Sequence, residues 1–149
     1  MKDRRAPAKK RILLIDDSPA QCELLRQALA QAGLDEVTQV EPGIESAFLF
    51  LEGQSASTHP LPELILLDLK LGNGSGLDFI SRLRSHPRLS LLPVVMLTTS
   101  DAPDDIRASY AGGANGYVVK PDTYHELVAV VGDVCRYWLC WNRSLNSTA

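Results

Sequence analysis

A chain of 149 residues has room for one folded domain around a single core, and we expect no second folded module. Its formal net charge of −3, with acidic and basic residues interspersed, argues against the strong basic field that nucleic-acid binding requires. The basic start of the chain leads into only four apolar residues, too few for a signal peptide or a membrane span, so we expect a cytoplasmic protein that binds neither nucleic acid nor membrane.

Short apolar runs alternate with helix patterns along the chain. The run at 12–15 is followed by a helix that Ser18 can cap, with Pro19 at its first position, and that Gly33 ends. A weaker strand at 36–40 and a helix around 44–51 come next, and residues 53–62 are rich in turn formers and predict a long surface loop. The remaining elements are strands at 64–67, 94–97 and 117–119, and helices at 76–85, from 103, and from 124 with Thr123 and Glu126 as a capping box.

Four of these strands end on polar residues. Asp16 and Asp17 follow the first, Asp68 follows the run at 64–67, Thr98 the run at 94–97, and Lys120 the run at 117–119. Short apolar runs are typical of strands buried on both faces of a parallel sheet, and their alternation with helices indicates βαβ units. We predict an α/β fold of five such units, in which the four strand ends meet at the edge where open α/β sheets bind ligands.

Three carboxylates at this edge need a counter-charge. Two unit charges about 6 Å apart at an effective dielectric constant of 20 repel by roughly 3 kcal/mol, so Asp16, Asp17 and Asp68 cannot all be ionised there alone. A divalent cation would resolve the conflict, and oxygen ligands without histidine or cysteine favour Mg²⁺. A helix cap is the alternative for the Asp16-Asp17 pair, and it is weakened because Ser18 and Pro19 already supply that cap.

The residues at the strand ends also match a known pattern. They are Asp16-Asp17, Asp68, Thr98, Tyr117 and Lys120-Pro121, with thirty positions from Asp68 to Thr98 and twenty-two from Thr98 to Lys120. In type and spacing they resemble the receiver domain of two-component response regulators, as in the single-domain chemotaxis regulators. The long loop before residue 64 and the aromatic last helix are further similar to the small regulators paired with cyanobacterial and bacterial phytochromes.

The resemblance implies a doubly wound (βα)5 flavodoxin-like receiver fold with a five-stranded parallel sheet and an extended C-terminal helix. This receiver domain would cover residues 11–141, between a basic N-terminal extension at 1–10 and a C-terminal tail at 142–149. The family resemblance implies that the protein is a phosphoacceptor in signalling rather than an enzyme. Asp68 would accept a phosphoryl group from a sensor histidine kinase, which is a bacteriophytochrome for some of the phytochrome-paired members.

The same resemblance assigns roles to the other site residues. Mg²⁺ would be held by Asp17, Asp68 and the backbone carbonyl of Lys70, with Asp16 acting through water.

In the family, the hydroxyl and the ammonium at the positions of Thr98 and Lys120 move to meet the phosphoryl oxygens. The aromatic at Tyr117 then rotates inward, and the change reaches the face formed by the fourth helix, the fifth strand and the fifth helix.

The chain departs from the family pattern in the loop after Asp68. Gly72 stands where the family usually has proline, and the glycine-rich stretch at 72–76 predicts an unusually flexible loop. Lys70 and Ser100 occupy variable positions that tune water access to the acyl phosphate.

The last helix predicts an interface. Residues 124–141, placed at 100° per residue, put apolar and aromatic side chains on an arc of about 200°, roughly twice what packing on one sheet needs. Tyr137, Trp138 and Trp141 on this arc are typical interface anchors, so we expect a homodimer or a partner surface there. The alternative is a helix that lies deeper in the core or is covered by the tail.

Other functions fit less well. A phosphatase that forms an aspartyl phosphate would usually have a second aspartate two residues after Asp68, where this chain has Lys70. A dinucleotide-binding oxidoreductase would have its glycine motif after the first strand, whereas Gly72, Gly74 and Gly76 follow the third with the wrong spacing. A receiver-like interaction or dimerisation module that is not phosphorylated stays open as the alternative.

Overall fold

The computed structural model describes residues 9–54, 60–72 and 74–145 of the chain. Its centre is a five-stranded sheet in the order β2-β1-β3-β6-β7, with every neighbouring pair parallel. The strands are β1 (Ile12–Ile15), β2 (Thr38–Glu41), β3 (Leu64–Leu67), β6 (Val94–Thr98) and β7 (Gly116–Val119). The predicted doubly wound fold is confirmed, and the strand order reverses between β1 and β3, which is where such sheets bind ligands.

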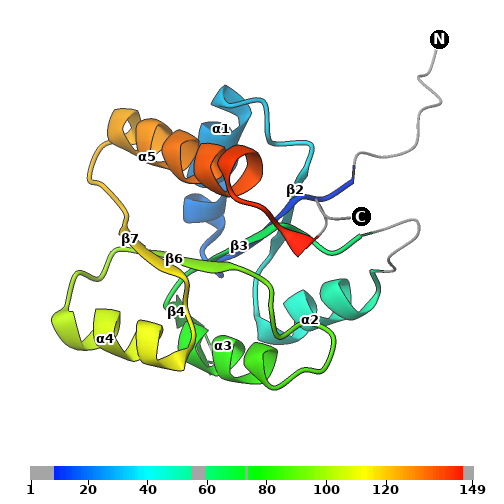
Figure 1. Cartoon of the computed structure of the whole chain (residues 1–149). Helices are drawn as coiled ribbons and strands as arrows, with labels where there is room; N and C mark the ends of the chain where they lie inside the picture. Colours follow the sequence, from blue (N-terminus) through cyan, green and yellow to red (C-terminus); the bar gives the residue numbers. More distant parts are fainter. Residues whose placement is uncertain (1–8, 55–59, 73, 146–149) are drawn as a thin grey trace, which may run out of the picture.

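Helices cover both faces of the sheet (Figure 1). One face carries α1 (Pro19–Gln31) and α5 (Tyr124–Arg136), and the other carries α2 (Ile44–Glu52), α3 (Gly76–Arg84) and α4 (Pro103–Gly112). Alternate residues of each central strand enter two separate cores. Leu13 and Ile15 pack with Phe48 and Phe79 on one side, whereas Leu14 packs with α1 and α5 on the other. Burial on both faces is why these strands are continuously apolar.

Two of the predicted helix starts are confirmed by their caps. The Ser18 hydroxyl accepts a hydrogen bond from the Gln21 N–H ahead of α1, and the Thr123 hydroxyl accepts one from the Glu126 N–H ahead of α5. These bonds satisfy backbone donors that have no partner inside the helix.

The second strand begins later than the predicted range of 36–40. Glu36 lies in a turn that is closed by a hydrogen bond from the Thr38 N–H to the Asp35 carbonyl, and the Thr38 hydroxyl donates to Leu34 O at 2.7 Å. A local side-chain hydrogen bond of this kind competes with strand pairing, so β2 runs from Thr38 to Glu41.

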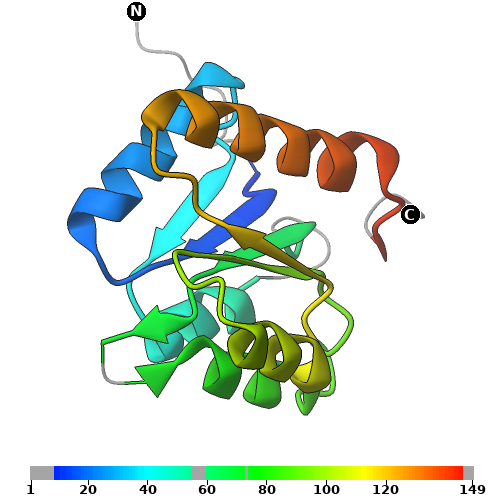
Figure 2. The same cartoon turned by 90° about the vertical axis from the view of Figure 1, so that its left-hand side faces the viewer.

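The segment after β3 forms a small hairpin that the sequence did not indicate. β4 (Lys70–Leu71) pairs antiparallel with β5 (Gly74–Ser75), and Ser75 then caps α3 in a capping box with Asp78. Figure 2 shows the hairpin at the edge of the sheet, ahead of α3. The expected flexibility of residues 72–76 stays a prediction, but the described part of this stretch has regular pairing.

The expected continuous α-helix through residue 141 is wrong in its last five residues. The α-helical part of α5 ends at Arg136, and Tyr137–Trp141 form a π-helix, η1, closed by a hydrogen bond from the Asn142 N–H to Tyr137 O at 2.6 Å. The Arg11 guanidinium donates to the Leu139 carbonyl inside this turn. A π-turn is wider than an α-turn, so side chains beyond Arg136 leave the arc that regular periodicity predicts.

No helix among the described residues is both long and apolar enough to cross a membrane.

Candidate functional site

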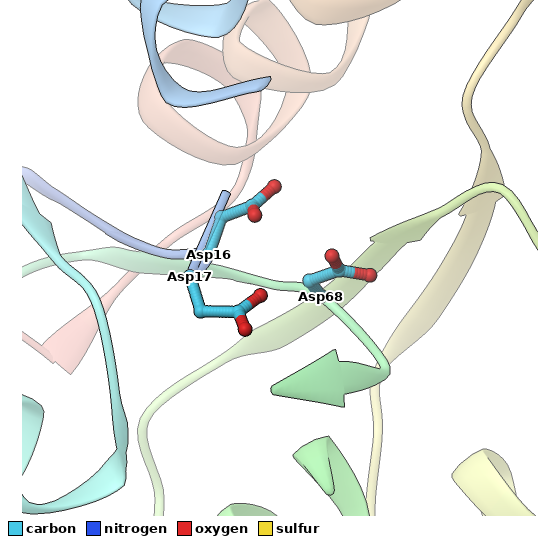
Figure 3. A group of neighbouring side chains, drawn as sticks. All are labelled: Asp16, Asp17 and Asp68. Carbon is cyan, nitrogen blue, oxygen red and sulfur yellow. The ribbon is translucent and has the colours of Figure 1, made fainter. Parts of the chain in front are cut away.

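The polar residues at the strand ends meet at the carboxyl edge of the sheet, as predicted. Asp16 and Asp17 follow β1, Asp68 follows β3, Thr98 is the last residue of β6, and Lys120 follows β7. One carboxylate oxygen from each of the three aspartates lies within 4.8 Å of the others. Figure 3 shows the three side chains grouped at the ends of these neighbouring strands.

Asp16 and Lys120 form the buried part of the site. Asp16 is 1% exposed, and its Oδ2 accepts a hydrogen bond from the Lys120 ammonium at 2.9 Å, while its Oδ1 accepts one from the Ser18 N–H at 3.0 Å. The Lys120 Nζ also lies 3.7 Å from Asp68 Oδ2. The single ammonium therefore lies between two carboxylates and is closer to Asp16.

Asp68 is partly exposed, and its surroundings oppose its charge. Burial raises the pKa of Asp68, and the neighbouring Asp16 carboxylate raises it further. The Lys120 charge and hydrogen bonds from the Thr98 side chain and the Lys70 backbone act in the opposite direction but do not outweigh burial. A cation bound next to Asp68 would therefore stabilise its ionised carboxylate.

Asp17 faces solvent, unlike Asp16. Its Oδ2 accepts a hydrogen bond from the Gly72 backbone N–H at 2.6 Å, which ties it to the hairpin after β3. Lys70, whose carbonyl the family resemblance assigns to the metal, pairs with Ser75 in the same hairpin. The hairpin therefore borders the site on the side of Asp17.

Tyr117 lies half-buried on β7 and packs against the core that contains Phe79. Its hydroxyl donates to the Ser100 backbone carbonyl at 2.9 Å, and the Ser100 hydroxyl donates to Asp105 Oδ2 at 2.5 Å near the start of α4. Thr98 is 2% exposed, and its hydroxyl accepts a long hydrogen bond of 3.5 Å from the Ser100 N–H. A chain of contacts therefore links the site with α4, and nothing in the sequence pattern pointed to the part played by Asp105.

Gly76 also belongs to the site, although the sequence pattern did not predict a role for it there. A Cβ at this position would lie 2.5 Å from the Asp68 carbonyl oxygen, and the Gly76 N–H donates to Leu69 O at 2.7 Å. Only glycine allows the start of α3 to approach the backbone after Asp68 so closely. A glycine in the first turn of a predicted helix, where its propensity is poor, was the available signal.

The three predicted interface aromatics do not share one exposed surface. Tyr137 is 52% exposed and Trp141 is 74% exposed, whereas Trp138 is half-buried against the core between the sheet and α5. The rings of Tyr137 and Trp138 meet edge to face with centroids 5.1 Å apart. Regular helical spacing already places Trp138 on the face of Leu127 and Val131, which is why this ring packs inward.

Comparison with known proteins gives one consistent result. A family model described as response regulator receiver domain matches residues 12–132. The probable methanogenesis regulatory protein FilR2 of Methanothrix harundinacea is 34% identical, with 89% of this chain and 86% of that protein covered. Response regulator Rcp1 of a Synechocystis species is 36% identical, with 93% of this chain and 95% of Rcp1 covered.

A solved structure, the phosphorylated cyanobacterial phytochrome response regulator RcpA, superposes with a TM-score of 0.80 at 31% identity. It covers 93% of this chain and 99% of the RcpA chain. The predicted resemblance to receiver domains, and to phytochrome-paired regulators among them, is confirmed.

Proposed function

Because the chain belongs to the response regulator receiver domain family, we propose that Asp68 accepts a phosphoryl group from a sensor histidine kinase. The observation that carries this proposal is the grouping of Asp16, Asp17 and Asp68 within 4.8 Å, together with a buried ammonium from Lys120. A carboxylate nucleophile and fixed positive charge are the parts that phosphoryl transfer requires, since the reaction depends mainly on positioning and charge neutralisation.

The donor set fits Mg²⁺. Three carboxylates and one ammonium leave an excess of two negative charges when all are ionised. At 4.8 Å and an effective dielectric constant of 20, a pair of carboxylates repels by about 3.5 kcal/mol. Oxygen donors alone, one of them on the exposed Asp17, suit a hard cation that keeps several waters. Asp17, Asp68 and the Lys70 carbonyl would hold the ion, and Asp16 would act through water. When bound, the ion neutralises charge on the phosphoryl oxygens.

The residues of the chain then have distinct parts in the transfer. An Asp68 oxygen forms the new P–O bond as the P–N bond of the phosphohistidine breaks, and the departing imidazole nitrogen keeps the electron pair and takes a proton from water. Lys120, already within 3.7 Å of Asp68, is placed to pair with a phosphoryl oxygen, and the Thr98 hydroxyl to donate to another.

Phosphorylation would act as a switch through Thr98 and Tyr117. Movement of the Thr98 hydroxyl toward the new phosphoryl oxygens would disturb the backbone at Ser100, to which the Tyr117 hydroxyl is bonded. Tyr117 would then rotate further inward, and the change would reach the α4–β7–α5 face. In this account the protein is a signalling phosphoacceptor and its output is a change in protein contacts.

The partner set follows from the same family. A sensor histidine kinase of the phytochrome type is proposed because relatives that cover nearly the whole chain include a phytochrome response regulator. A homodimer through the α4–β7–α5 face is supported by exposed side chains of Tyr110, Val119 and Tyr124, and by Tyr137 and Trp141 beyond them. We propose a cytoplasmic location, where the kinase domain of such a sensor would lie.

Intact mass of the protein tests the proposal. Incubation with Mg²⁺ and acetyl phosphate is expected to add about 80 Da to the wild-type chain and nothing to Asp68→Asn. Asp78 is an exposed aspartate of α3, and Asp78→Asn is the matched control that should still gain the mass. If acetyl phosphate is inert, a phosphorylated histidine kinase replaces it as donor. A mass gain that persists in Asp68→Asn, or no gain from either donor, would overturn the proposal and favour a non-phosphorylated interaction module.

A further inference from the structure

The hydrogen bond between Gly72 and Asp17 gives the glycine a role that its place in a loop does not suggest. Within the part of the chain that the structure describes, the Gly72 N–H is the only donor that contacts the Asp17 carboxylate, and the N···Oδ2 distance is 2.6 Å. A bond from a backbone N–H to an ionised carboxylate is among the stronger hydrogen bonds. It engages one oxygen of Asp17 and leaves the other available to a ligand.

Asp17 needs such an anchor more than the other two aspartates do. Asp16 is buried and held by Lys120 and Ser18, whereas Asp17 is exposed and lies beside an open cavity of about 470 Å³ that it lines together with Gly72. Repulsion from the two neighbouring carboxylates favours rotation of the Asp17 side chain out of its present position, which lies within 4.8 Å of both. The Gly72 N–H opposes this rotation.

Residue 72 supplies the bond because it is glycine. Proline, the usual residue here in the family, has no N–H to donate. A Cβ on residue 72 would lie 3.0 Å from Asp17 Oδ2, so any side chain would also push the carboxylate from its present position. The short bond therefore depends on both features of glycine, a free N–H and the absence of a side chain.

We propose that Gly72 is a positioning residue for the metal: its backbone N–H holds the Asp17 carboxylate toward Asp16 and Asp68 and thereby tightens the binding of Mg²⁺. The proposal rests on the magnesium site described above. Hydrogen bonds to ligating carboxylates typically change metal affinity by 10- to 100-fold when they are removed, which sets the expected size of the effect.

Two variants at one position separate the N–H from the side chain. Gly72→Ala adds a Cβ and keeps the N–H, whereas Gly72→Pro adds a Cβ and replaces the N–H hydrogen with the ring carbon Cδ. Calorimetric titration with Mg²⁺ is expected to give a dissociation constant about 10-fold higher for Gly72→Pro than for Gly72→Ala, with the wild type at least as tight as Gly72→Ala. Equal constants for the two variants, or tighter binding by Gly72→Pro, would overturn the proposal.

Phosphorylation by acetyl phosphate distinguishes positioning of the metal from general damage. At limiting Mg²⁺, Gly72→Pro is expected to react about 10-fold more slowly than Gly72→Ala, and at saturating Mg²⁺ the two rates should converge. A rate deficit that persists at saturation would show a structural effect of proline and contradict the proposal.

Amide hydrogen exchange of the metal-free wild type adds a measurement that needs no change at residue 72. The exposed Gly72 amide is expected to be protected from exchange, and Asp17→Ala is expected to remove that protection while the sheet amides keep theirs. An unprotected Gly72 amide in the wild type would contradict the proposal. Failure of the wild type to bind Mg²⁺ at all would instead overturn the magnesium site itself, so the two failures are distinguishable.

Discussion

Gly76 lies where the start of α3 passes against the backbone that follows Asp68. Its missing side chain is a requirement of the site, because a Cβ would approach the Asp68 carbonyl oxygen to 2.5 Å, and a backbone atom cannot swing aside as a side chain can. The position of the candidate phosphoacceptor thus depends on a residue that carries no chemistry of its own.

Gly76→Ala is therefore expected to lower the free energy of unfolding by about 1–3 kcal/mol, as overpacking does, and to slow phosphorylation of Asp68. Urea unfolding measures the first effect. Gly132→Ala in α5 is the matched control: nothing lies within 4 Å of its Cβ, and alanine favours a helix interior by up to about 1 kcal/mol, so this variant should be as stable as the wild type or more so. Equal stability of the two variants would show that the close approach at Gly76 is not a constraint.

The Asp68 carboxylate makes the free energy of unfolding depend on pH, and its raised pKa sets the direction of that dependence. Burial raises the pKa of Asp68 above 3.8, the usual value for an aspartate, and the Asp16 carboxylate adds to the increase. An aspartate that binds its proton more tightly in the folded state stabilises the protein fully below the unfolded pKa, and this stabilisation is lost as the pH rises through the raised folded pKa.

Asp68→Asn carries no such charge, so without metal it is expected to be more stable than the wild type at neutral pH. The difference should shrink as the pH falls through the raised folded pKa and should be smallest below 3.8, the usual pKa of an aspartate. Urea unfolding in the presence of a chelator measures it. Mg²⁺ should then stabilise the wild type much more than Asp68→Asn, since a ligand stabilises only the folded form that binds it. A wild type that is the more stable of the two in chelator would contradict the balance of charges described for this site.

Among the elements, the carboxyl-terminal helix shows most clearly what a periodic pattern can and cannot predict. The apolar face of the α-helical part packs as expected, with Leu127, Val131 and Cys135 buried at intervals of four residues. The π-turn after Arg136 follows no propensity signal, since it is stabilised by contacts from distant segments such as the Arg11 bond to the Leu139 carbonyl. Such contacts exist only once the fold has formed.

The π-turn predicts different effects for its two tryptophans. Trp138→Ala removes a half-buried ring and is expected to cost about 2 kcal/mol of stability, less than a fully buried aromatic. Trp141→Ala removes a ring that is 74% exposed and should change stability by less than about 0.5 kcal/mol while weakening self-association. Urea unfolding and sedimentation equilibrium measure the two effects. Unchanged self-association in Trp141→Ala would exclude this residue from the proposed dimer surface.

At the scale of the whole molecule, the sheet explains why so much of the site could be predicted. Once the runs ending at Asp16, Asp68, Thr98 and Lys120 are parallel neighbours, their carboxyl ends must share an edge, so strand periodicity alone brings those four residues together.

The finer arrangement could not be predicted in this way. The bond from Gly72 to Asp17, the approach of Gly76 to Asp68 and the link from Ser100 to Asp105 each depend on the path of a short loop, which leaves no repeat in the sequence. Loops position these groups through individual hydrogen bonds and close contacts, and those are properties of the folded chain.

The central claim, that Asp68 is the phosphoacceptor, is tested most directly by chemical trapping of the acyl phosphate. Borohydride reduces an aspartyl phosphate to homoserine, which peptide mass spectrometry locates in the chain after incubation with Mg²⁺ and a phosphodonor. We predict homoserine at position 68 and at neither Asp16 nor Asp17, although all three carboxylates lie within 4.8 Å of one another. Homoserine at position 16 or 17, or a phosphorylated protein that yields none, would contradict the account.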